Sequence, residues 1–189
     1  MNGDNTFAFR LREEMPVFMP FTRLTDATLV ALMGYDYEPV ELDGLYGYGE
    51  YFRARWWPPR SFINVEHDCV PWPGALESLA DCPEPWCAYW YSLACVRDAD
   101  INHPTTSVPL GCVKVGERLI DATRGAWDDP IKWHRCDGYL TQIAREAGFR
   151  VHRHYPGIVN ACSWMDPDLV RTNPRLAPYL DGEKWVPSF

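Results

Sequence analysis

The segment Phe62-Ile63-Asn64-Val65-Glu66-His67-Asp68 decides how the rest of the chain is interpreted. Its first four residues are mostly apolar and β-branched or aromatic, which is typical of a buried strand. Glu66 and Asp68 follow where that strand ends, and the prolines and glycine at 71–74 predict a turn before a helix. In α/β sheets ligands bind at the carboxyl ends of strands, so the segment predicts a binding site at these two carboxylates.

Two carboxylates in this position can bind a hard divalent cation, and that cation can clamp a diphosphate. Magnesium and manganese prefer oxygen ligands, which fits carboxylates better than nearby thiols. The pattern therefore indicates a metal-dependent enzyme acting on a nucleotide-activated substrate. The spacing leaves another interpretation open, in which Glu66 and Asp68 are solvated turn residues and Asp68 helps to cap the following helix.

The composition bounds the class of protein. A chain of 189 residues with 47% hydrophobic residues fits one domain with a full core. The net charge of −8 disfavours direct binding to nucleic acid, which normally needs a basic face. The N-terminal residues show no signal-peptide pattern, and no stretch is long and apolar enough to span a membrane, so no membrane partner is expected.

The cysteines indicate the compartment. There are seven, an odd number, and no Cys-x-x-Cys pair occurs. Neither a disulfide framework nor a zinc knuckle is therefore expected. Several cysteines lie in apolar runs and are predicted to be small buried hydrophobes, which favours a reducing, cytoplasmic setting.

Strands and helices are predicted to alternate along the chain. Strands are expected at 16–21, 38–44, 62–65, 86–91, 110–115 and 149–152, and helices at 22–33, 46–57, 73–81 and 137–147. The last helix has the clearest apolar stripe, and Gly148 supplies its stop. This order predicts an α/β fold with a mostly parallel central sheet. One domain is expected over 1–166, with a Pro-rich tail at 167–189 packed on it.

With these elements placed, the chain resembles the GT-A superfamily of nucleotide-sugar-dependent glycosyltransferases, in a compact form similar to glycosyltransferase family 2. The resemblance spans 16–164 and is carried by three segments. Residues 62–76 resemble the family's strand, its Asp-X-Asp metal motif and the helix that follows. Residues 111–116 resemble the acceptor-side strand, and residues 136–151 resemble the acidic motif, helix and final strand.

The resemblance implies a single-domain GT-A-like fold and a metal-dependent glycosyltransferase, inverting at the anomeric carbon. The donor would be a nucleoside diphosphate sugar, and the acceptor hydroxyl would belong to a protein, a glycan or a modified nucleobase. Mn²⁺ or Mg²⁺ would be held by Asp68, Glu66 and His154, with Glu66 contacting either the donor ribose or the metal through water. Asp137 would be the general base. The residues themselves leave other roles open: Asp137 as a helix N-cap, His134 as a competing base, and His154 as a surface histidine.

Three further residues are candidate donor contacts. Asp43, after the second strand, is expected to hydrogen-bond the ribose or nucleobase, unless it is only a polar turn residue. Arg60 is a candidate for the diphosphate, although a solvated position is the alternative. Trp127, with Trp133, is a candidate sugar-stacking ring, and the alternative is a place in the core.

Two other functions stay open at this point. A catalytically degenerate nucleotide- or sugar-binding domain, or a structural protein, is consistent with a Glu at position 66 and a short chain. A nucleotidylyltransferase would share the α/β architecture and the carboxylates. Those enzymes normally carry a Gly-rich signature and a Lys near the N-terminus, and residues 16–23 contain neither.

Overall fold

A computed structural model describes most of the chain. The described residues are 15–22, 24, 26–89, 107–154, 158–160, 180–181 and 184–185. The end of the strand predicted at 86–91 and most of the tail predicted at 167–189 lie outside these residues.

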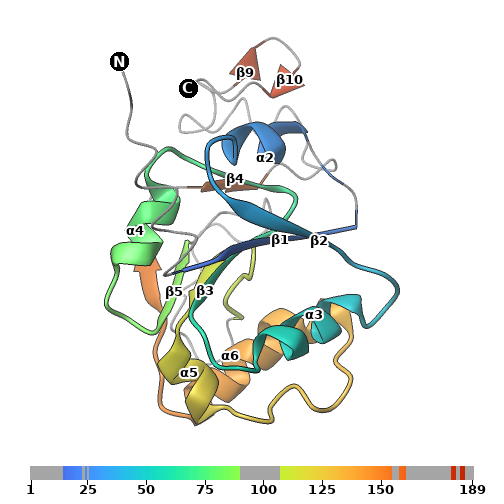
Figure 1. Cartoon of the computed structure of the whole chain (residues 1–189), viewed down its shortest axis with the longest axis vertical. Helices are drawn as coiled ribbons and strands as arrows, with labels where there is room; N and C mark the ends of the chain where they lie inside the picture. Colours follow the sequence, from blue (N-terminus) through green and yellow to red (C-terminus); the bar gives the residue numbers. More distant parts are fainter. Residues whose placement is uncertain are drawn as a thin grey trace.

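A six-stranded sheet forms the centre of the molecule (Figure 1). Its strand order is β2 (Tyr37–Glu41), β1 (Val17–Phe21), β3 (Phe62–Val65), β6 (Cys112–Val115), β5 (Trp86–Tyr89) and β7 (His152–His154). Strand β6 pairs antiparallel with both of its neighbours, and every other pair in this sheet is parallel. The α/β class and the mostly parallel sheet are therefore confirmed.

Helices cover both faces of the sheet (Figure 1). On one face lie α3 (Gly47–Arg55), α5 (Glu117–Ala122) and α6 (Cys136–Glu146), and on the other lie α2 (Asp26–Ala31) and α4 (Ala75–Asp81). Because side chains alternate along a strand, β3 sends Phe62 and Asn64 toward α3, and Ile63 and Val65 toward α4. Among the described residues, no helix combines the length and apolarity needed to cross a bilayer.

The end of α6 shows why the last sheet strand begins later than predicted. Gly148 has a φ of 85°, and its amide donates to the Arg145 carbonyl (2.9 Å). The Phe149 amide donates to the Ala144 carbonyl (2.9 Å), which completes a Schellman motif. Phe149 is thus still part of the helix end and packs on the core, so β7 starts only at His152.

Several short elements were not predicted from the sequence, and α5 and β4 are two of them. Helix α5 follows β6 directly at Glu117. Strand β4 (Cys69–Pro71) lies in the segment predicted as a turn, and it pairs antiparallel with β8 (Ile158–Asn160) outside the main sheet. Both elements are held by partners distant in the sequence, which local patterns do not reveal.

Aromatic rings fill the core between the sheet and α3. Trp127 is 2% exposed, and its ring stacks on Phe52 with centroids 4.9 Å apart and lies edge-on to Trp56 at 5.5 Å. The prediction that Trp127 stacks on a sugar is wrong, because no face of the ring is open to a ligand. Trp133, its predicted companion, is 59% exposed.

The two tryptophans therefore form a matched pair for a stability measurement. Trp127→Ala should lower the free energy of unfolding by about 3–5 kcal/mol, since it removes a fully packed aromatic side chain. Trp133→Ala should change it by no more than about 0.5 kcal/mol. Urea unfolding followed by circular dichroism measures both, and equal effects of the two substitutions would contradict this description of the core.

Candidate functional site

The candidate site begins where β3 ends. The Glu66 amide donates to the Gly111 carbonyl (2.7 Å), which continues the pairing with the β6 side by one residue. The Cys69 amide then donates to the Glu66 carbonyl (2.9 Å) and closes a turn around Asp68. Glu66 and Asp68 are partly buried, and one carboxylate oxygen of each lies within 4.8 Å of the other and of the Cys69 sulfur.

A buried hydrogen-bond network fixes the Glu66 side chain. Asn64 is fully buried; its Oδ1 accepts from the Tyr51 hydroxyl (2.7 Å), and its Nδ2 donates to the Tyr48 hydroxyl (3.1 Å) and to the Leu110 carbonyl (2.6 Å). The Tyr48 hydroxyl donates to Glu66 Oε1 at 2.5 Å. The orientation of Glu66 is thus set by α3 and by the segment before β6, and none of these partners was predicted from the sequence.

Glu66 lies in an environment that resists its ionisation. Burial raises its pKa, the charges of Asp137 and Asp68 raise it further, and the hydrogen bond from Tyr48 lowers it; the resulting pKa is about 8. The pKa of Tyr48 is also well above its ordinary value, first because of burial and then because of Glu66 and Asp137. Because the charge of Asp137 raises the pKa of both Glu66 and Tyr48, Asp137 lies within electrostatic range of Glu66. The two acids are 71 positions apart in the chain.

Helix α6 delivers Asp137 to this site. The helix follows a 3₁₀ turn, η1 (Trp133–Arg135), and Asp137 lies in its first turn. The Thr141 hydroxyl donates to the Asp137 carbonyl (2.7 Å) and accepts from the Val108 amide (2.8 Å), so α6 is tied to the segment before β6. Residue 135 occupies the N-cap without a side-chain capping bond, so Asp137 is not the N-cap.

The Asp137 carboxyl is itself perturbed. Burial raises its pKa from 3.8 to about 6, and a backbone hydrogen bond opposes this shift. A carboxylate with a pKa near 6 is ionised at neutral pH and is a stronger proton acceptor than an exposed one. Asp137 therefore has the ionisation properties that a general base requires. We use the name acidic site for Glu66, Asp68 and Asp137.

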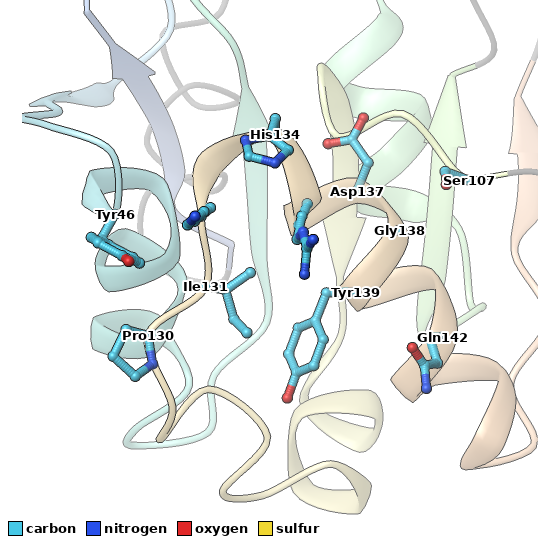
Figure 2. Close-up of a pocket in the computed structure, with 11 residues that line it drawn as sticks. Tyr46, Ser107, Pro130, Ile131, His134, Asp137, Gly138, Tyr139 and Gln142 are labelled. Carbon is cyan, nitrogen blue, oxygen red and sulfur yellow. The ribbon is translucent and has the colours of Figure 1, made fainter.

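An open pocket of about 800 Å³ adjoins Asp137 (Figure 2). Its walls are the first turns of α6, the 130–135 segment and Tyr46. Figure 2 shows His134 and Asp137 at the same end of this pocket. The 130–135 segment can approach α3 because residue 49 is a glycine: a Cβ at that position would collide with the Ile131 carbonyl oxygen.

The chemistry of the acidic site fits a divalent cation. Glu66 and Asp68 offer oxygen atoms, which Mg²⁺ and Mn²⁺ prefer, whereas the adjacent Cys69 sulfur is a poor ligand for them. The charges of Asp68 and Asp137 oppose ionisation of Glu66, and a bound cation would relieve that repulsion.

The predicted donor contacts have different outcomes. Asp43 is exposed and follows β2. Because β2, β1 and β3 are parallel, Asp43 lies at the same carboxyl end of the strands as Glu66. Arg60 precedes β3 and so lies at the amino end of that strand, roughly 20 Å from Glu66 along an extended chain. The prediction that Arg60 contacts a diphosphate held at Glu66 is therefore wrong.

His154 lies in a different group from the one predicted. It belongs to a group of four side chains whose ligand atoms all lie within 4.8 Å of one another: Cys82, Cys87, His152 and His154. We call this group the Cys/His cluster. Within the described residues, His154 does not form such a group with the Glu66 and Asp68 oxygens. The prediction from sequence missed this cluster, because its cysteine and histidine pairs are 65 residues apart.

Comparisons with known proteins give weak matches. No protein-family model matches the sequence, and no curated protein matches it. One similar solved structure is a glycosyltransferase involved in the glycosylation of the major capsid of PBCV-1, with 13% identity and a TM-score of 0.47 over 79% of this chain and 94% of that chain. Another is A197 from STIV, with 12% identity and a TM-score of 0.49 over 75% of this chain and 81% of that chain. Matches of this weakness carry no information about the reaction.

The pKa of Glu66 predicts a pH dependence of stability. Its folded pKa of about 8 lies above the ordinary 4.5, so the folded state retains a proton that the unfolded state releases between these pH values. The stabilisation is complete below pH 4.5 and is lost as the pH rises through about 8. Relative to Glu66→Gln, the wild type should therefore lose stability from pH 5 to 8, by at most about 1.4 kcal/mol per pH unit.

Urea unfolding at several pH values measures this difference. Glu50→Gln, on the exposed side of α3, is the matched control and should follow the wild-type curve. A constant difference between wild type and Glu66→Gln across this range would contradict the assigned environment of Glu66.

Proposed function

We propose that the chain is a metal-dependent glycosyltransferase that moves a sugar from a nucleoside diphosphate sugar to an acceptor hydroxyl. The observation that carries the proposal is the acidic site: Glu66, Asp68 and Asp137 gather at the carboxyl end of β3, beside an open pocket. Burial and the charges of Asp137 and Asp68 oppose ionisation of Glu66, so the arrangement favours a role in binding or chemistry over a structural one.

On the donor side, Glu66 and Asp68 would hold Mn²⁺ or Mg²⁺. When bound, the ion would supply positive charge that offsets the negative charge developing on the leaving nucleoside diphosphate. Tyr48 donates to one Glu66 oxygen, which leaves the other carboxylate oxygen to face the donor. Asp43, exposed at the carboxyl end of the neighbouring strand β2, would contact the ribose or base.

On the acceptor side, Asp137 would accept the proton of the attacking hydroxyl. That oxygen bonds to the anomeric carbon while the bond from this carbon to the diphosphate oxygen breaks. Because the hydroxyl attacks opposite the leaving group, a single displacement of this kind inverts the configuration. His134 lies on η1, shortly before Asp137, and its exposed ring lines the pocket, where it would position an acceptor.

Donor binding is the first test of this function. UDP, GDP or another nucleoside diphosphate should raise the melting temperature in the presence of Mn²⁺, because a ligand that binds the folded state stabilises it. Asp68→Asn should abolish the Mn²⁺-dependent shift. The control is Asp121→Asn, which removes an exposed carboxylate on α5 and should leave the shift intact. If no nucleotide shifts the wild type with either metal, the proposed function fails.

The role of Asp137 is tested separately, once a donor and acceptor are found. Asp137→Asn should lower kcat by about 10²–10⁴-fold and leave the donor Kd within a few-fold, since a general base acts in the chemical step. The wild-type kcat should rise as the pH increases through about 6, where Asp137 ionises, and the variant should lack this rise. Full activity in Asp137→Asn together with loss of activity in His134→Gln would assign the base to His134.

A further inference from the structure

The Cys/His cluster lies on the face of the sheet opposite to Asn64 and Glu66. Strands β5 and β7 are parallel neighbours, with Cys87 beside His152 and Tyr89 beside His154. Cys87 and Tyr89 both belong to the core under α4, so the two histidines, two residues apart, point to that face as well. Cys82 joins them from the C-terminal end of α4.

The cluster is already close to the geometry of a tetrahedral site. The Cys82 sulfur lies 3.1 Å from His152 Nδ1, and all four ligand atoms lie within 4.8 Å of one another. In tetrahedral zinc sites with bonds of about 2.0–2.3 Å, the ligand atoms are roughly 3.3–3.8 Å apart. Rotations of side chains are therefore sufficient to close the cluster around one ion.

One ring nitrogen of His154 is left without a partner. His154 Nε2 is buried and makes no hydrogen bond. The other nitrogen, Nδ1, lies 2.9 Å from the Ser78 hydroxyl. If the Ser78 hydroxyl accepts a hydrogen bond from the Nδ1–H group, Nε2 carries a lone pair. A buried lone pair without a partner is unfavourable. Histidines that ligate metals show this arrangement, with one nitrogen on the ion and the other on a protein hydrogen-bond partner.

We propose that Cys82, Cys87, His152 and His154 bind one Zn²⁺ ion in a tetrahedral Cys₂His₂ site. Two thiolates and two imidazoles are a ligand set that zinc favours, and they differ from the oxygen ligands of the acidic site. The inference is independent of the proposed function, because it uses none of the same residues.

A buried lysine lies beside the cluster. Lys114 is 4% exposed, lies beside Cys87 across the β5–β6 pair, and donates to the Cys82 carbonyl. A buried ammonium needs nearby negative charge, and two zinc-bound thiolates would supply it.

The ion would have a structural role. Strand β7 is three residues long, stands at the edge of the sheet and pairs only with β5 among the described strands of that sheet. Zinc would join β7 and β5 to the end of α4, three elements that come from separate parts of the chain. Because Cys82 is only half-buried and His152 is exposed, an ion can reach the site from solvent.

The metal content of the full chain tests the proposal. Protein purified under reducing conditions and supplied with Zn²⁺ should retain about one zinc per chain after desalting, as measured by mass spectrometry of the metal. Co²⁺ in its place should give the visible absorption of a tetrahedral thiolate complex. Removal of zinc by a chelator should lower the melting temperature, because the ion stabilises the folded state.

Variants identify the ligands. Cys82→Ser and His152→Ala change half-buried and exposed positions, so both should fold, and each should lose the zinc and the cobalt–thiolate absorption. Cys136→Ala removes a buried thiol outside the cluster and should keep both. Asp68→Asn should also keep both, which separates this site from the acidic site.

Three results would overturn the proposal. Reduced wild-type protein could retain no zinc and give no thiolate absorption with cobalt. The two ligand variants could retain as much zinc as Cys136→Ala. Intact-mass and thiol measurements could instead reveal a disulfide between Cys82 and Cys87 in protein kept under reducing conditions.

Discussion

The buried side chain of Asn64 is the constraint on which the candidate site depends. An amide inside a strand core is costly unless each of its groups is paired, and here Tyr51, Tyr48 and the Leu110 carbonyl pair all of them. Satisfying this one residue fixes α3 and the segment before β6 relative to β3. It also orients the Tyr48 hydroxyl, which then holds Glu66. A hydrophobic residue at position 64 would leave the buried Tyr51 hydroxyl and the Leu110 carbonyl without this partner, so the amide specifies how these elements are arranged.

The acidic site beside this network lowers the stability of the folded state when its carboxyl groups ionise. Burial and like charges raise the pKa of Glu66 to about 8 and burial raises that of Asp137 to about 6, so ionising both at neutral pH costs free energy. Neither shift would be needed for a solvated turn, where carboxylates ionise freely. A bound cation, as proposed for this site, would offset that cost.

The sequence predicted what local patterns encode, and failed where distant residues decide. Strand β3 and helix α6 were found because an apolar run and an apolar stripe mark them directly. The convergence of Glu66 and Asp137 came from a resemblance to a family, since no spacing links residues so far apart. Trp127 was misjudged because the local sequence does not show which way its indole ring turns, and in the structure the ring packs inward onto Phe52. Asn64 passed unnoticed because a single polar residue in an apolar run does not reveal its partners.

The parity of the strands explains the different positions of Glu66 and His154. Val65 and Ile63 face α4, so Glu66, one residue later, faces α3 and meets Tyr48. His154 pairs beside Tyr89, its ring lies 5.3 Å from the tyrosine ring, and Tyr89 faces α4. The sheet therefore separates the two residues, and a one-residue shift of β7 would be needed to exchange their faces. The Schellman motif at Gly148 ends α6, and the register of β7 on β5 then places both histidines on the face of Cys87 and Tyr89. The helix that carries Asp137 to the acidic site thus leads into the strand that carries His152 and His154.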